Sequence, residues 1–285
     1  MCDKHGPRPP MPSDPVEQPG VKLYAGRHGA GEPTLVFVHG FCCNGSDWEH
    51  QVRRFMPSHQ VLAPDLPGHG PSPAFGECTV QDLIDDTAAL VDAEVSGSCV
   101  MIGHSMGCRV VLGVGQSLPE RVIGLVFVDG SSVGSGDPDG AAAAVVARLR
   151  DDGITATLRR SFEQMFVPGS DETLRDAIVQ RALAMPAHVV ETLMPDVFRW
   201  DTLNLRSVLS TIGQPVLALQ STRVDHAAVR VPIASEDGVP WLELLREHVR
   251  QLDVEIIAGA GHFSMIERPT AVNAAIEKFI ASLPA

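Results

Sequence analysis

A serine stands between two glycines in the stretch Gly103-His104-Ser105-Met106-Gly107, at the end of the apolar run SCVMI. Glycine has no Cβ, so this spacing is typical of a turn that is crowded from both sides. The run before it resembles a buried strand, and RVVLGVGQSL after it has the length of a helix. A turn from strand to helix would lift the Ser105 hydroxyl out of the sheet, which makes it a candidate nucleophile; the alternative is an ordinary tight turn.

The segments around this turn alternate between short apolar runs and helical stretches from Thr34 onward. The apolar runs are TLVFV, QVLAPDL, SCVMI, VIGLVFVDG, PVLALQS and VEIIAGAGH, and the amphipathic stretch AVNAAIEKFIASL ends the series. Such alternation is the signature of βαβ units. It predicts an α/β fold with a mostly parallel sheet flanked by helices.

The alternation is interrupted once, by a long stretch of helix formers without a good strand candidate. Helices inserted after a sheet strand would form a lid over the carboxyl ends of the strands, where ligands bind. We therefore expect a helical cap over residues 131–206 and a core domain built from residues 21–130 and 207–285. Six prolines in the first twenty residues favour a flexible leader over residues 1–20.

Four motifs occur in order at the predicted strand ends. They are HGF at 39–41, PDLPGHG at 64–70, GHSMG at 103–107 and GAGHFSMIERP at 259–269. In these motifs and their order the chain resembles the α/β-hydrolase superfamily from Val21 to the C-terminus. The resemblance implies a serine hydrolase that needs no cofactor and no metal, with its functional residues at the positions that match the motifs.

The resemblance makes Ser105 the nucleophile and His262 the base that accepts its proton. The chemistry asks for the same pair, because a serine hydroxyl is a weak nucleophile unless an imidazole removes the proton. His262 follows the apolar run VEIIA in a Gly-Ala-Gly setting, which places it at the predicted carboxyl edge of the sheet. We expect His39 and His69 to bond to loop backbone instead, and His104 to point to the other side of the turn.

The family stabilises the negative charge that develops on the attacked carbonyl with two backbone N–H donors. By resemblance these are the amides of Met106, which follows the nucleophile, and Phe41, which follows His-Gly. The alternative for HGF is a tight turn after a strand.

The acid that orients His262 has two candidates. In most relatives it follows the strand that here is PVLALQS, within a G-x-x-D turn, but this chain has STRVDH, where Asp225 comes one residue late and no glycine precedes it. Asp129, at the end of LVFVDG, is the second candidate, because some relatives place the acid there. Both positions fall at the carboxyl edge of the predicted sheet, so the sequence leaves the choice open.

The predicted cap carries several large apolar residues. Most are expected to pack the cap onto the core, and Phe162, Phe166 and Trp200 are the candidates for contact with substrate. They suggest a site for an apolar acyl or alcohol group.

The bulk properties exclude several classes of partner. A net charge of −13 over 285 residues argues against nucleic acid and against an anionic membrane surface. No stretch approaches the ~20 apolar residues of a membrane span, and the N-terminus lacks the apolar region of a signal peptide. The six cysteines show no C-x-x-C spacing, so we expect reduced thiols in a cytoplasmic protein. The oligomeric state stays open, a homo-oligomer included.

Together these residues predict a serine hydrolase that cleaves a carboxylic ester of a small or medium apolar substrate through an acyl-enzyme. The alternatives are a lactonase, a carbon–carbon bond hydrolase or a cofactor-free haloperoxidase with the same three residues, and a non-catalytic small-molecule receptor. Epoxide hydrolases and haloalkane dehalogenases are disfavoured, because those relatives have aspartate in place of Ser105. The expected partner is a small-molecule ester or lactone.

Overall fold

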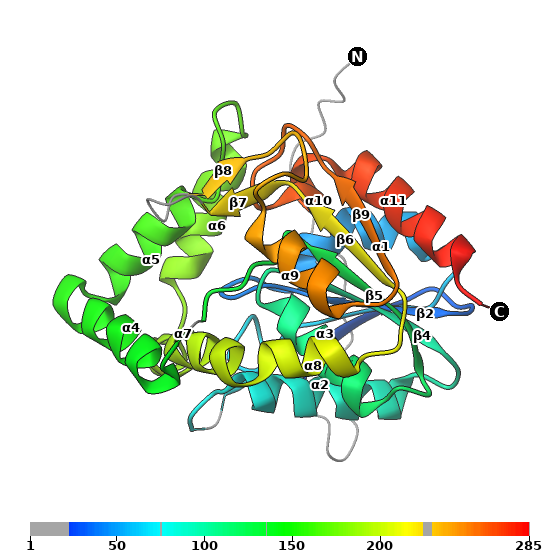
Figure 1. The fold of residues 1–285 in the computed structure, drawn as a ribbon, viewed down its shortest axis with the longest axis horizontal. Helices are drawn as coiled ribbons and strands as arrows, with labels where there is room; N and C mark the ends of the chain where they lie inside the picture. The colour runs from blue at the N-terminus through cyan, green and yellow to red at the C-terminus, as the bar shows by residue number, and fades with distance from the viewer. Residues whose placement is uncertain (1–22, 75, 135, 225–229, 285) are drawn as a thin grey trace.

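The computed structural model describes residues 23–74, 76–134, 136–224 and 230–284. A seven-stranded sheet runs through the centre, in the order β1-β3-β2-β4-β5-β6-β9 (Figure 1). Its strands are β1 (Ala25–His28), β2 (Thr34–Val38), β3 (Val61–Pro64), β4 (Cys99–His104), β5 (Val122–Val128), β6 (Val216–Gln220) and β9 (Leu252–Ile256). Only β1 pairs antiparallel within this sheet. The predicted fold class is therefore confirmed; the expected leader, residues 1–20, lies outside the described residues.

Two layers of helices cover the sheet because its strands are apolar on both faces. Along β2, Val36 and Val38 belong to one buried cluster, while Leu35 and Phe37 belong to the other. The first cluster includes side chains from α2 (Val80–Glu94), α3 (Gly107–Ser117), α8 (Arg206–Thr211) and α9 (Pro240–His248). The second includes side chains from α1 (Glu49–Phe55), α10 (Ser264–Glu267) and α11 (Pro269–Ser282), and the 3-10 helix η1 (Gly45–Trp48) precedes α1.

Four helices follow β5 and lie together beyond one end of the sheet (Figure 1). They are α4 (Pro138–Asp152), α5 (Ile154–Glu163), α6 (Glu172–Leu183) and α7 (Ala187–Trp200). We call them the helical insertion. Asp137 and Asp171 begin α4 and α6 by accepting hydrogen bonds from the first backbone N–H groups, as helix N-caps do.

The insertion returns to the core through the π-helix η2 (Asp201–Leu205), which leads from α7 directly into α8. Helix therefore continues past residue 206, where the sequence placed the end of the cap. The division into cap and core remains a prediction. Within the described parts of the chain, every helix is too short or too polar to span a bilayer.

A second, two-stranded sheet lies beyond the end of β6. Strands β7 (Thr222–Val224) and β8 (Arg230–Pro232) pair antiparallel, with Thr222 opposite Pro232. The sequence did not predict this hairpin. It occupies the position where most members of the resembled family have the acid-bearing turn.

Candidate active site

Ser105 occupies a strained turn between β4 and α3. Its backbone lies in the left-handed region at φ 54°, and its amide donates to the Val128 carbonyl at 3.0 Å. A Cβ on Gly103 would lie 2.4 Å from the Gly107 carbonyl oxygen, and one on Gly107 would lie 2.4 Å from that of Val38. No side chain fits at that distance, so the two glycines are what allow β4, α3 and the end of β2 to meet around the serine.

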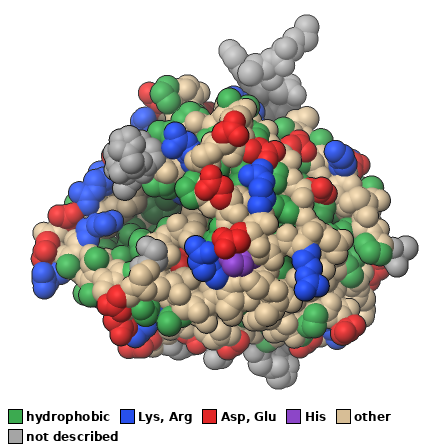
Figure 2. Space-filling view, in the orientation of Figure 1, with side chains coloured by type: hydrophobic (Ala, Val, Ile, Leu, Met, Phe, Trp, Pro, Cys, Tyr) green, Lys and Arg blue, Asp and Glu red, His purple; other side chains and the backbone are tan. Residues whose placement is uncertain are grey.

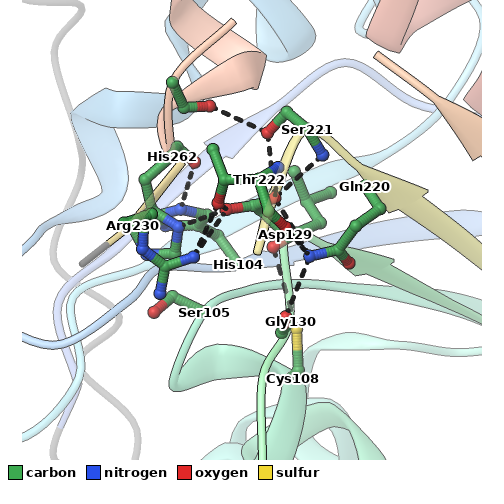
Figure 3. Close-up of polar contacts among 12 residues, drawn as sticks. His104, Ser105, Cys108, Asp129, Gly130, Gln220, Ser221, Thr222, Arg230 and His262 are labelled. Carbon is green, nitrogen blue, oxygen red and sulfur yellow. Dashed lines mark hydrogen bonds and ion pairs between the residues drawn. The ribbon is translucent and has the colours of Figure 1, made fainter. Parts of the chain in front are cut away.

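His262 lies in the loop after β9, and its ring faces the end of β5 (Figure 3). Its Nδ1 is 2.6 Å from Oδ2 of Asp129, and its amide donates to the Met165 carbonyl at 2.8 Å. The structure thus brings Asp129 to the histidine. Asp225, the other candidate acid, lies outside the described residues.

The residues that follow β6 surround the Asp129 carboxylate (Figure 3). Oδ1 accepts from the Ser221 amide at 2.8 Å, the Ser221 hydroxyl at 2.9 Å and the Thr222 amide at 2.8 Å. It also accepts from Gln220 Nε2 at 3.1 Å. Oδ2 accepts from the Thr222 hydroxyl at 2.5 Å and from Arg230 Nη1 at 3.0 Å, in addition to its contact with His262. Ser221 and Thr222, which follow β6, therefore bind the carboxylate just after β5 together with Gln220 and Arg230.

This environment sets the charge states of the pair. Burial alone would raise the pKa of Asp129, but the hydrogen bond and charge of His262, together with Arg230 and Thr222, hold that pKa well below its usual range. Burial and the positive charge of Arg230 lower the pKa of His262 to about 4, although the hydrogen bond and the charge of Asp129 raise it. At neutral pH the site therefore holds a carboxylate and a neutral imidazole, the form that can accept a proton.

Backbone strain is concentrated at this site. Among the described residues, the non-glycine residues with positive φ are Cys42 at 57°, Ser105 at 54° and Asp129 at 46°. Each stands at or just after the carboxyl end of a central strand, in the loops after β2, β4 and β5. Strained conformations of this kind persist where surrounding contacts enforce them, and they cluster at functional sites.

The predicted oxyanion donors lie in two different loops at the carboxyl ends of the strands. Met106 is the residue before α3, and Phe41 lies in the loop after β2. Neither amide has an acceptor among the described residues, whereas Cys42 N donates to His69 Nε2 and Cys43 N donates to the Gly40 carbonyl. Two backbone donors thus remain for a ligand.

The other motif histidines contact backbone. Nε2 of His39 accepts from the Leu66 amide at 2.9 Å, and Nε2 of His69 accepts from Cys42. Nε2 of His104 pairs with the His262 carbonyl at 3.0 Å. All three side chains are buried, and burial lowers the pKa of each.

The candidate substrate residues differ in exposure. Phe162 and Trp200 are buried, at 2% and 5% exposed, within packing clusters. Phe166 is partly buried and stacks on Phe263 with ring centroids 5.3 Å apart, and Phe263 follows His262 in sequence. Contact with substrate stays a prediction for all three, and Phe166 is the one that lies nearest to the histidine loop.

Two arginines near the serine were missed in the sequence, because no motif marks them. Arg230 reaches Asp129 from β8, as described above. Arg109, on α3, forms a buried ion pair with Asp201 at 2.6 Å and also donates to the carbonyls of Ser105 and Ser131. It therefore joins the serine turn to both ends of the helical insertion.

The described residues hold no group of three or more His, Cys, Asp or Glu side chains placed to bind a metal. The chemistry available at the site is that of a serine hydroxyl, an imidazole, a carboxylate and two backbone donors.

Comparison with known proteins places this arrangement in context. The sequence model described as the alpha/beta hydrolase family matches residues 35–275. The pimeloyl-[acyl-carrier protein] methyl ester esterase of Salmonella agona is 30% identical over 266 residues, which cover 90% of this chain and 97% of that protein. Est816, a solved N-acyl homoserine lactone degrading enzyme, aligns with a TM-score of 0.75 at 25% identity and covers 93% of this chain and 99% of its own. A thermophilic esterase from Thermogutta terrifontis aligns with the same TM-score at 22% identity, over 91% of this chain and 93% of its own.

Proposed function

This chain belongs to the alpha/beta hydrolase family, and from that premise we propose that it hydrolyses a carboxylic ester of small or medium apolar character through an acyl-enzyme on Ser105. The observation that carries the proposal is the 2.6 Å contact between His262 Nδ1 and Asp129 Oδ2 at the end of the strands that hold Ser105. A carboxylate on Nδ1 keeps the proton there and leaves Nε2 as the lone-pair base.

The proposed reaction has two steps. Oγ of Ser105 attacks the ester carbonyl while His262 Nε2 takes the hydroxyl proton, and the amides of Phe41 and Met106 donate to the developing oxyanion. The C–O bond to the alcohol then breaks, and the alcohol leaves with the proton from His262. Water repeats the sequence on the acyl-enzyme, which releases the acid and restores the serine.

The names of the relatives support ester cleavage. One relative is a methyl ester esterase, and a lipase of Mycobacterium tuberculosis is 34% identical over 110 residues, 38% of this chain and 42% of the lipase. A lactonase is the second candidate, because Est816 degrades an N-acyl homoserine lactone and matches nearly the whole chain. A lactone is a cyclic ester, so the same residues would perform both reactions.

The test separates a hydrolase from a receptor that only kept the fold. A fluorophosphonate probe should label the protein on Ser105, and Ser105→Ala should abolish both labelling and hydrolysis of p-nitrophenyl esters while circular dichroism stays unchanged. More than a few per cent of residual hydrolysis in this variant would refute the assignment. Esters of increasing chain length, assayed beside a lactone panel, then decide between the two candidates.

Two further expectations enter as proposals. The helical insertion serves as a cap over the site, which is supported by the bond from the His262 amide to the carbonyl of Met165, just past α5. The protein acts in the cytoplasm, which is supported by the five described cysteines, all of them free. Cell fractionation tests the second proposal.

A further inference from the structure

A basic pocket of about 420 Å³ lies between the helical insertion and the β7–β8 hairpin. Its walls include Arg148 on α4, Arg160 on α5 and Arg230 on β8, with the apolar side chains of Met165 and Val224. The described residues that line it include no acidic side chain. The space-filling view shows a hollow on the insertion side of the molecule with basic side chains at its rim (Figure 2).

The pocket shares two residues with the candidate active site. Arg230 Nη1 donates to Asp129 Oδ2 at 3.0 Å and to the Thr222 hydroxyl at 2.7 Å. Met165 accepts from the His262 amide through its carbonyl. The pocket therefore adjoins the histidine side of the site, and in the proposed reaction the alcohol leaves on that side because His262 delivers its proton.

Arg230 has more donors than its described partners use. Its side chain is only 12% exposed, and its contacts with the described residues all involve Nη1. A guanidinium has five N–H groups and no acceptor, so the Nε and Nη2 donors have no described acceptor. A carboxylate is planar and accepts two parallel N–H groups from such a fork.

The other two arginines extend the positive region outward. Arg160 is paired with Asp152 at 2.6 Å, whereas Arg148 makes no hydrogen bond or ion pair with another described residue. These cations gather on a chain whose net charge is −13. Positive side chains gathered around a cavity favour the binding of an anionic ligand there.

We propose that the substrate carries a carboxylate on its alcohol part, and that the pocket of Arg148, Arg160 and Arg230 binds this group. The proposal rests on the proposed ester hydrolysis and adds the substrate class. The alcohol oxygen lies at His262 and the carboxylate lies between Arg230 and the insertion. Arg230 and the two helix arginines thus determine specificity, while Ser105, His262 and Asp129 perform the chemistry.

The kinetic test compares two esters that differ only in this charge, p-acetoxybenzoate and its neutral methyl ester. The double variant Arg148→Gln/Arg160→Gln should lower the ratio of their kcat/KM values about tenfold or more, since hydrogen bonds to charged groups contribute at that level. The matched control is Arg150→Gln/Arg159→Gln, which removes the same charge from the same two helices at exposed residues paired with Asp151 and Glu163. It should change the ratio less than about twofold, because neither arginine lines the pocket.

Equal effects of the two double variants would overturn the proposal. The proposal would also fail if Arg148→Gln/Arg160→Gln lowered kcat/KM only for substrates with a carboxylate on the acyl part. Mono-p-nitrophenyl succinate, compared with p-nitrophenyl butyrate, measures that case. Arg230→Gln should also lower the ratio for p-acetoxybenzoate, and Arg230→Lys should restore part of it.

A binding measurement keeps the pocket separate from the reaction. Calorimetric titration with p-hydroxybenzoate, the acidic product alcohol, should give a Kd about tenfold weaker for Arg148→Gln/Arg160→Gln than for the control variant, even if no ester is turned over. An unchanged Kd in both double variants would refute carboxylate binding in the pocket. Failure of Ser105→Ala to abolish hydrolysis would instead refute the proposed function alone.

Discussion

Replacing Asp129 with asparagine is the most direct test of how the site works. The substitution keeps the size of the side chain and removes its charge. Every described contact of the carboxylate is with a donor: four reach Oδ1 and three reach Oδ2. An amide must place its NH₂ group against one of these sets, so no orientation of the asparagine satisfies them all.

The expected loss of activity depends on whether the NH₂ group of the asparagine faces the donors to Oδ1 or the donors to Oδ2. If it faces the Oδ2 set, His262 Nδ1 must become the acceptor, which moves the ring proton to Nε2 and removes the base that Ser105 needs. Loss of this orienting carboxylate in a serine protease lowers kcat by ~10⁴, and we expect a similar fall here. Arg230, 12% exposed, also loses its ion-pair partner. Breaking one half of a buried pair costs about 3–5 kcal/mol of stability.

The assay measures kcat with a p-nitrophenyl ester and the free energy of unfolding with urea, for Asp129→Asn and Asp225→Asn in parallel. We expect Asp129→Asn to lose activity by orders of magnitude under conditions where circular dichroism shows it to be folded, and Asp225→Asn to lose little. The reverse result would refute the reasoning and assign the orienting acid to Asp225. A double variant with near wild-type kcat would exclude both residues.

Three further predictions concern protons and packing. In the proposed reaction His262 must be neutral to accept a proton, so kcat/KM should stay level down to about pH 5 and fall with a midpoint near the pKa of about 4. Arg230→Gln should move that midpoint upward in a pH–rate profile. The pKa of buried His69 is also lowered to about 4, so at pH 5 the unfolded state binds more protons than the folded state. The free energy of unfolding, measured in urea titrations, should therefore fall by about 2 kcal/mol per such histidine between pH 7 and pH 5. Arg109→Met should destabilise the protein by about 3–5 kcal/mol because it leaves the Asp201 charge buried without a counter-ion. Asp201→Asn should cost a similar amount, because it leaves the Arg109 charge buried without a counter-ion.

The sequence predicted those parts of the fold that local pattern determines. The apolar run TLVFV matches β2 (Thr34–Val38) residue for residue, and VLALQ within PVLALQS matches β6. Strand β1, with the sequence AGRH, carries no such pattern and exists through its antiparallel pairing with β3. The π-helix η2 likewise carries no local signal, and its first residue, Asp201, is bonded to Arg109, 92 residues away along the chain.

The site was predictable where a motif fixes a backbone shape. The glycines on either side of Ser105 are dictated by contacts of 2.4 Å that no side chain would tolerate, so the turn could be inferred from the sequence. The contact between Asp129 and His262 could not be inferred, because it depends on residues far apart along the chain. Arg230 meets Asp129 across a separation of 101 residues, and only the fold shows that Ser221 and Thr222 surround the carboxylate.

The end of β5 explains why these distant pieces meet. The Val128 carbonyl holds the Ser105 amide, and the next residue, Asp129, donates its own amide to the Leu219 carbonyl on β6. The proposed nucleophile and the carboxylate at His262 are therefore both fixed by backbone bonds among three adjacent parallel strands. Their separation depends on the sheet and does not depend on the helical insertion.

The insertion is attached to this rigid edge at both of its ends. Arg109 donates to the carbonyls of Ser105 and Ser131 and pairs with Asp201, and the Asp201 carboxylate also accepts from the Val133 amide. One buried ion pair thus joins the serine turn, the start of the insertion and its end. Arg148 and Arg160 lie between these two attachments and contact neither Ser105 nor His262, so we expect their substitution to leave the serine turn in place. Met165 lies in the same stretch, and its carbonyl accepts from the His262 amide. If the proposed roles hold, the helices set specificity and the sheet sets catalysis, so exchanges within α4 and α5 should alter the choice of substrate before they alter the acyl-transfer chemistry.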